Sequence, residues 1–292
     1  MTGSTKSAKE CAVSNSVIYP QRVLSLGAGV QSTALLLMMV KKELPMADHV
    51  IFADTGWEPK KVYKHLEWLR GIMTENNIPF HIVSKGNIRE DFLSAEKGQR
   101  YASMPLHLIG EDGKPGMIRR QCTSEYKLEP LMKKQRELAG LKGGQRCKDH
   151  RITTVIGISY DESQRMRDPK FSWIKHDYPL VDNKISRQDC IDWCIANGYP
   201  QPPRSACIGC PFKNQDEWRY LKQVEEEWDD AVQFDKALRE SPNVKARFRG
   251  QAFLHKSKVP LSVADIRTDK EKGILDLFGD NFNQECEGMC GI

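Results

Sequence analysis

The chain has 292 residues, of which 39% are hydrophobic and 28% are charged, and it carries a formal net charge of +5. This composition is that of a globular chain long enough for one large α/β domain with an appendage, and it argues against a disordered or fibrous protein. The longest apolar run, residues 34–40, is too short to cross a bilayer, so no membrane partner is expected. The modest positive charge permits a nucleotide or nucleic-acid partner without requiring one.

The N-terminal sequence contains no apolar signal core, and we interpret residues 1–20 as a flexible lead-in to a cytoplasmic protein. The chain contains nine cysteines. Without a secretion signal, cysteines are better interpreted as reduced thiols, metal ligands or redox groups than as a disulfide framework.

Residues 23–37 (V-L-S-L-G-A-G-V-Q-S-T-A-L-L-L) predict a buried strand, a glycine turn and a helix that opens near Gln31 and Ser32. Glycine lets backbone N–H groups approach an anion, and the start of a helix favours negative charge, so this pattern indicates a phosphate site. An ordinary strand-to-helix turn is the alternative. No Gly-Lys-Ser/Thr follows, which excludes a Walker A loop, and the third glycine of a dinucleotide fingerprint is missing.

Strands and helices then alternate. Residues 49–53 predict a short strand that ends in Asp54-Thr55-Gly56, residues 60–76 a helix, and residues 80–83 a third strand. This alternation predicts a parallel sheet whose ligands sit at the carboxyl ends of the strands, the edge that the first glycine turn should share with the D-T-G sequence. A plain turn is the alternative for D-T-G.

Further along, residues 85–116 lose periodicity and predict a long functional loop or lid. Residues 122–138 predict a helix, and residues 152–158 a strongly β-branched strand. That strand ends in G-I-S-Y-D-E-S-Q-R-M-R, which fits ligand contact as well as a helix capping box.

The C-terminal part predicts a helix at residues 187–197, capped by Ser186, and one long amphipathic helix at residues 216–239. We therefore divide the chain into three parts. These are a lead-in (1–20), a nucleotide-binding domain (21–212, with a lid-like loop at 85–118), and a helical appendage with a cysteine-containing tail (213–292).

The cysteines are unevenly spaced. Cys207-x-x-Cys210 before a proline is typical of half a metal or cluster site. Cys190 and Cys194 could form a second pair, but their spacing within a predicted helix fits buried core residues equally well. Cys122 lies in R-R-Q-C-T-S-E-Y-K, where positive charge lowers a thiol pKa and attracts anions; a solvated basic helix start is the alternative.

Taken together, the motifs resemble the phosphoadenosine-phosphosulfate (PAPS) reductase family, within the adenine-nucleotide α-hydrolase-like (PP-loop ATP pyrophosphatase) superfamily. The resemblance covers about residues 22–212 and rests on G-A-G-V-Q-S, F-A-D-T-G-W-E-P, R-Q-C-T-S-E-Y-K-L-E-P-L, T-V-I-G-I-S-Y-D-E-S-Q-R and C-I-G-C in this order. It implies a Rossmann-like three-layer α/β sandwich with a parallel sheet, a cysteine-bearing insertion and a helical C-terminal appendage.

The resemblance also implies ligands and site residues. The ligand would be an adenine nucleotide, either ATP, with Mg²⁺ accompanying it, or PAPS or its relative APS. The implied nucleotide-binding residues are Ser25, Gly27, Gly29, Gln31, Ser32, Asp54, Thr55, Gly56, Arg119, Arg120, Gly157, Glu162, Ser163 and Arg165. The implied ligands of an iron–sulfur cluster of the [4Fe–4S] type are Cys122, Cys207 and Cys210, with Cys194 a candidate for the fourth position. Lys127 and a tail cysteine, Cys290 or Cys286, are the expected catalytic residues, and an external thiol the expected reductant.

The chain departs from the family pattern at informative positions. Gln31 stands where ATP-cleaving members carry aspartate, and Gln121 stands where cluster-bearing reductases have a second cysteine next to Cys122. Three hypotheses remain open: a sulfonucleotide reductase, an ATP-dependent sulfurtransferase that modifies a nucleic acid held by the basic run 133–151, and a non-catalytic nucleotide-binding subunit.

Overall fold

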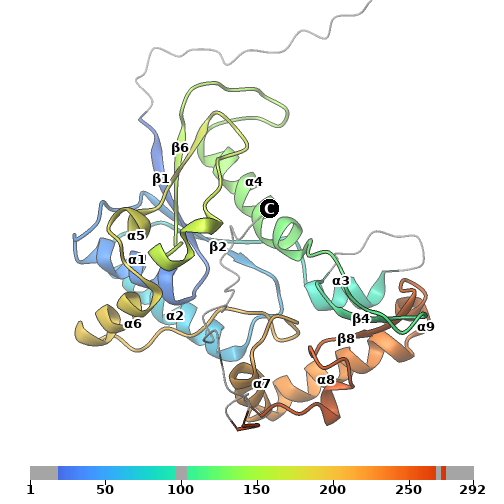
Figure 1. The fold of residues 1–292 in the computed structure, drawn as a ribbon. Coiled ribbons are helices and arrows are strands. Elements are labelled where there is room, and N and C mark those ends of the chain that lie inside the picture. Colours follow the sequence, from blue (N-terminus) through green and yellow to red (C-terminus); the bar gives the residue numbers. More distant parts are fainter. Residues whose placement is uncertain (1–18, 96–103, 268–270, 274–292) are drawn as a thin grey trace, which may run out of the picture.

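The computed structural model describes residues 19–95, 104–267 and 271–273. Within these ranges the main sheet has five strands in the order β3-β2-β1-β6-β7, and all neighbouring pairs are parallel (Figure 1). The strands are β1 (Gln21–Leu26), β2 (His49–Asp54), β3 (Phe80–Ser84), β6 (Ile152–Ile156) and β7 (Ile174–Asp177). The predicted parallel α/β sheet is confirmed, and β7 is a strand that the sequence did not predict.

Side chains of the central strands alternate between the two faces of the sheet. Leu24 and Leu26 of β1 pack on one face, whereas Val23 packs on the other. In β2, Val50 likewise joins the first face and Ile51 the second. Because both faces bury apolar residues, these strands carry continuous hydrophobic runs, as expected for a parallel sheet covered on both sides.

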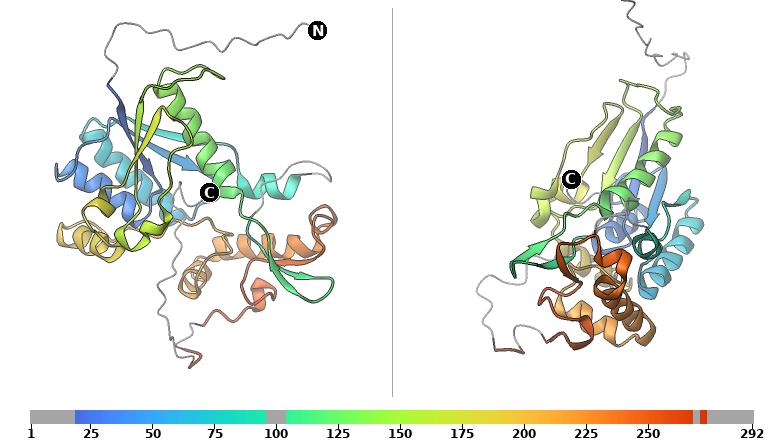
Figure 2. Two further views of the ribbon diagram at one scale, coloured as in Figure 1. Left: turned by 45° about the horizontal axis from the view of Figure 1, so that its top comes forward. Right: turned by 90° about the vertical axis from the view of Figure 1, so that its right-hand side faces the viewer.

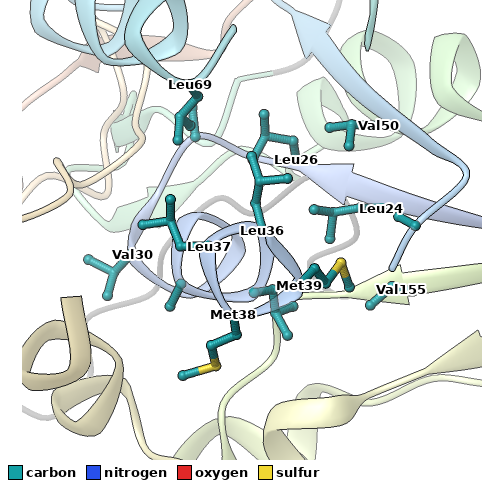
Figure 3. Packing of buried hydrophobic residues seen from close by; sticks show 14 of the residues in the cluster. Leu24, Leu26, Val30, Leu36, Leu37, Met38, Met39, Val50, Leu69 and Val155 are labelled. Atoms are coloured by element: carbon teal, nitrogen blue, oxygen red, sulfur yellow. The ribbon is translucent and has the colours of Figure 1, made fainter. Parts of the chain in front are cut away.

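The first face is covered by α1 (Val30–Val40), α2 (Lys60–Glu75) and α6 (Arg187–Ala196). Figure 3 shows Leu36 and Met39 of α1 directed at the strands, near Leu24, Val50 and Val155. The second face is covered by α4 (Glu129–Leu138), through Leu131. The three-layer arrangement is therefore confirmed.

Helix ends follow the predicted signals closely. Ser186 caps α6 through a capping box with Asp189, as predicted, and Gly198 adopts φ +75° just beyond the helix. The predicted helix at 122–138 begins with a π-helical turn, η1 (Thr123–Leu128), before α4. The start of α2 is capped from elsewhere, because Glu227 accepts the backbone N–H of Lys60 at 2.6 Å.

The prediction of a long loop at residues 85–116 is wrong in part, because these residues contain regular structure, whereas a role as a lid stays a prediction. They form α3 (Ile88–Ser94), β4 (His107–Gly110) and most of β5 (Pro115–Met117). β4 pairs antiparallel with β5 and also with β8 (Gly250–Phe253) near the C-terminal end of the described chain. This distant partner explains why the stretch showed no local pattern.

The single long helix predicted at 216–239 is also wrong. The chain forms α7 (Gln215–Lys222) and α8 (Glu225–Glu240), separated at Gln223 and Val224. Apolar residues of both helices, such as Trp218 and Phe234, join a second core with Trp57 and Phe92. These C-terminal helices gather at one end of the molecule, beyond the main sheet (Figure 2).

The remaining elements are short. They are η2 (Tyr160–Arg165), α5 (Pro179–Asp182), α9 (Pro242–Lys245) and η3 (Leu261–Val263). In the part of the chain that the structure describes, no helix has the length and apolar character needed to cross a lipid bilayer. The division of the chain after residue 212 stays a prediction, although the second core contains residues from both sides of that point.

Candidate functional site

The glycine turn leads directly from β1 into α1, with Gly29 as the residue before the helix. Ala28 adopts φ +55°, and the backbone N–H of Gly27 donates to Oγ of Ser32 at 3.1 Å. Ser25, on β1 before the turn, is buried. The first residues of the helix lack acidic side chains, so the N-terminus of α1 keeps its preference for an anion.

Gln31 connects this turn to the other half of the sheet. Its Nε2 donates to Glu162 Oε2 at 3.2 Å and approaches Ser159 Oγ at 3.5 Å, both in the segment after β6. The order of the sheet reverses between β1 and β6, and in open α/β sheets such a switch point is where ligands bind. Gln31 is fully buried, and within the described residues its Oε1 has no hydrogen-bond partner.

The predicted residues after β6 lie on the same side of the switch point. Gly157 is buried, Ser163 is half-buried, and Arg165 forms an ion pair with Glu162 across one turn of η2. The guanidinium of Arg165 is thus held beside the switch point by a carboxylate of the same segment. Capping and ligand contact were both open for this cluster, and no described side chain caps η2.

Asp54 ends β2 and shapes its own turn. Its Oδ1 accepts the backbone N–H of Gly56 and the hydroxyl of Tyr63, each at 2.8 Å. Burial, followed by this hydrogen bond, raises the pKa of Tyr63, so its hydroxyl remains a donor. Gly56 adopts φ +71°, and a Cβ there would lie 2.9 Å from Cα of Asn87. A glycine is therefore required at this turn.

Thr55 connects the edge of the sheet to residues 207–210, which we call the cysteine loop. Its hydroxyl donates to Glu58 Oε1 at 2.9 Å and lies 3.3 Å from Sγ of Cys207. Cys207 also donates to Glu58 Oε1 at 3.5 Å, and the ammonium of Lys127 lies 3.7 Å from the same oxygen. Glu58 and Lys127 are 3% and 4% exposed, so this is a buried ion pair beside a thiol.

A cavity of about 30 Å³ adjoins this cluster. Of the described cysteines, Cys122, Cys207 and Cys210 line it, together with Lys127 and Arg120. Three of the four cysteines predicted as cluster ligands are thus brought to one pocket, at the same edge of the sheet as Thr55. We call this cavity the cysteine pocket.

The donor type in the cysteine pocket suits an iron–sulfur cluster or zinc, both of which bind thiolates. Even so, among the described residues no three Cys, His, Asp or Glu side chains are placed to hold a metal ion. Cys194 does not supply the fourth position. It is buried in the core between α1 and α6, and burial raises its pKa to about 11.

Other predicted residues are more scattered. Arg120 lies over the ring of Phe212 at 5.4 Å, whereas Arg119 is exposed outside the lining of the cysteine pocket. Cys286 and Cys290 lie outside the described residues.

Glu58 and Ser159 belong to the site but were not predicted as site residues. Glu58 sits in the quoted stretch F-A-D-T-G-W-E-P, so an acidic residue two positions beyond the D-T-G turn was the available signal. Ser159 likewise sits in the quoted stretch T-V-I-G-I-S-Y-D-E-S-Q-R, as a polar residue just after a strand, but its approach to Gln31 depends on the fold.

Comparison with known proteins agrees with this geometry. The family model described as "Phosphoadenosine phosphosulfate reductase domain" matches residues 21–175, which is more than half of the chain. The match runs from β1 to β7 and includes the glycine turn, the D-T-G turn and Cys122. No curated protein matches the chain.

Proposed function

The chain belongs to the phosphoadenosine phosphosulfate reductase domain family, and we propose on this basis that it binds a sulfonucleotide and releases its sulfur as sulfite. The adenine nucleotide would lie across the switch point, between the turn at Gly27–Gly29 and the segment after β6. Its sulfate end would face the cysteine pocket. Arg120 and Lys127, which line that pocket, supply positive charge for an anionic group.

The observation that carries this proposal is the contact between Thr55 and Cys207, over 3.3 Å. Thr55 belongs to the edge of the sheet where a nucleotide is expected, and Cys207 belongs to the thiol-lined pocket. A ligand with an adenosine part at one end and a reducible sulfur at the other suits two adjoining sites of this kind.

The chemistry would use a cysteine thiolate as nucleophile. The thiolate attacks the sulfur of the sulfonucleotide, an S–S bond forms, and the S–O bond breaks with its electron pair leaving on the phosphate oxygen. An external thiolate then attacks the cysteine sulfur of the thiosulfonate, which releases sulfite and leaves a mixed disulfide. A second thiol reduces this disulfide, so two thiols supply two electrons. Cys290 or Cys286 stays the predicted nucleophile.

Cys122, Cys207 and Cys210 are proposed to supply three ligands of an iron–sulfur cluster. When bound, such a cluster would supply redox-active iron beside the substrate. The buried pair of Glu58 and Lys127 would orient the lysine ammonium toward the pocket whether or not a cluster is present.

A second candidate, an ATP-dependent sulfurtransferase acting on nucleic acid, is favoured by the charge of one segment. Residues 133–151 contain seven Lys and Arg against two Asp and Glu. Such a segment attracts a phosphate backbone. Mg²⁺ would accompany ATP in that case.

The test is an assay of the full chain, purified anaerobically, with PAPS, APS or ATP and with dithiothreitol as the reductant. We expect thiol-dependent sulfite release from PAPS or APS, lost in the double variant Cys286→Ser/Cys290→Ser and retained in Cys147→Ser. Sulfite release that survives the double variant would overturn the nucleophile assignment. Pyrophosphate release from ATP that depends on RNA or DNA, without sulfite, would favour the second candidate. Nucleotide binding without either product would indicate a non-catalytic subunit.

A further inference from the structure

A second cavity, distinct in its lining from the cysteine pocket, lies against the two flanks of the Cys207–Cys210 loop. It is lined by residues that include Lys61, Arg204, Ala206, Lys213, Glu217 and Tyr220. Arg204 and Ala206 precede the loop and Lys213 follows it, while α2 and α7 supply the remaining side chains. Nothing in the proposed sulfonucleotide chemistry uses this cavity.

The cavity gathers positive charge. Lys213 is 8% exposed, and its Nζ donates to the carbonyl oxygen of Ala206 at 3.4 Å. A carbonyl accepts a hydrogen bond but does not neutralise the charge, and a buried ammonium is costly unless an anion accompanies it. Lys61 also lines the cavity, with Nζ 3.6 Å from the centre of the Tyr220 ring.

The carboxylate in the cavity is already engaged. Glu217 Oε2 pairs with Arg204 at 3.0 Å and accepts the backbone N–H of Asn214 at 2.8 Å, as part of the capping box of α7. Among the described lining residues, three are cationic and this one is anionic. Burial, then the charges of Lys213 and Arg204, lower the pKa of Lys61, with Glu217 and Glu227 opposing them.

We propose that this cavity binds a tetrahedral oxyanion, the phosphate or sulfate group, between Lys61, Arg204 and Lys213. The enclosed volume is only about 10 Å³, so the anion would sit at the mouth with one oxygen directed inward to Lys213. Tyr220, which also lines the cavity, is 40% exposed, so the lining includes a residue in contact with solvent. The bound group would connect α2, the cysteine loop and α7, and so would stabilise the loop that carries Cys207 and Cys210.

Lys61 offers the cleanest test because it is only half-buried, and Lys64 on the exposed face of the same helix is its matched control. Melting temperature would be followed against sulfate at constant ionic strength, with chloride as the balancing salt. We expect Lys61→Met to require about tenfold more sulfate for the half-maximal rise, the loss expected for one charge-assisted hydrogen bond. Lys64→Met should match the unaltered chain, and Lys61→Arg should retain most of the response.

Crystals soaked in selenate should show an anomalous peak beside Lys61, Arg204 and Lys213. A parallel titration with adenosine monophosphate separates two sources of the oxyanion. If Lys61→Met weakens the binding of sulfate alone, the ligand is a free oxyanion. If it weakens the binding of both sulfate and adenosine monophosphate, the ligand is the phosphate of a nucleotide. Equal responses of Lys61→Met and the unaltered chain, or a selenate peak only at other places, would overturn the proposal. None of these readouts depends on sulfite release.

Discussion

Gln31 and Glu162 are joined by a hydrogen bond of 3.2 Å that crosses the switch point of the sheet. It runs from the first turn of α1 to η2, the segment after β6, and so connects the two segments between which the nucleotide is proposed to lie. Gln31 stands at the position where the family resemblance predicts an aspartate for an ATP-cleaving member. An amide, unlike an aspartate, can donate to a carboxylate there without charge repulsion.

Replacing Gln31 should therefore weaken nucleotide binding. In Gln31→Leu the side chains of Ser159 and Glu162 lose a hydrogen-bond donor. This loss costs about 1–3 kcal/mol. Where the cost destabilises the nucleotide complex, it raises the dissociation constant by roughly 5- to 150-fold. Calorimetric titration with adenosine monophosphate measures this effect. Gln164→Leu, which alters an exposed glutamine of the same segment, should bind as the unaltered chain does. Equal affinities for both variants would contradict a role for Gln31 in the cleft.

The cysteines divide into two groups with different expected phenotypes. Cys122, Cys207 and Cys210 line the cysteine pocket. Replacing any one of them by serine should lower the iron and acid-labile sulfide content of anaerobically purified protein. Cys147→Ser should keep it, because Cys147 is buried elsewhere and donates to the carbonyl oxygen of Asp149 at 3.6 Å. Protein that lacks iron and contains stoichiometric zinc would replace the cluster with a zinc site.

Gly209, in the cysteine loop, should tolerate no side chain. A Cβ at this position would lie 2.1 Å from Cη2 of Trp57, a buried ring that also packs against Phe234. Gly209→Ala should lower the free energy of unfolding by about 1–3 kcal/mol, measured by urea denaturation, because the indole cannot move aside. At Gly143 no heavy atom lies within 4 Å of the added Cβ, so Gly143→Ala should change stability by less than about 1 kcal/mol. Similar losses in both variants would show that the effect is not steric.

Stability should fall in mild acid. Burial lowers the pKa of His65, whose Nε2 lies 2.9 Å from the hydroxyl of Thr33, to about 4, and burial also lowers that of His255 to about 4. Between pH 6.5 and 4 the unfolded chain binds more protons at these groups than the folded chain, so the free energy of unfolding decreases as pH falls. Each histidine should contribute about 2 kcal/mol to the loss between pH 7 and pH 5.

Urea denaturation at the two pH values checks this, with His65→Gln and His255→Gln each expected to reduce the acid-induced loss by about 2 kcal/mol. A variant as sensitive to pH as the unaltered chain would show that its histidine is charged in the folded state.

Much of the fold was predictable because its signals are local. The apolar strands, the glycine turn and the Ser186 cap each act within a few residues, and the structure confirms them. The failures have long-range causes. β4 pairs with β8 from the far end of the described chain, and α7 and α8 share one apolar periodicity across the break at Gln223.

The site shows the same division. The motif residues Thr55 and Cys207 were predicted separately, but their contact depends on how the cysteine loop returns to the sheet. Cys194 could not be excluded from its spacing, since only the packing of α6 on α1 places it in the core.

The pairing of β4 with β8 also sets the order in which the molecule can form as it is synthesised. The parallel sheet has all its described strands once Asp177 has been made. β4 can pair with β5 early, but its pairing with β8 must wait for Phe253. Chains fold from the N-terminal end as they leave the ribosome. The switch point around Gln31 can therefore assemble early, whereas the second core around Trp57 packs last. A nascent chain stalled between these two points would bind a nucleotide before its cysteine loop is secured.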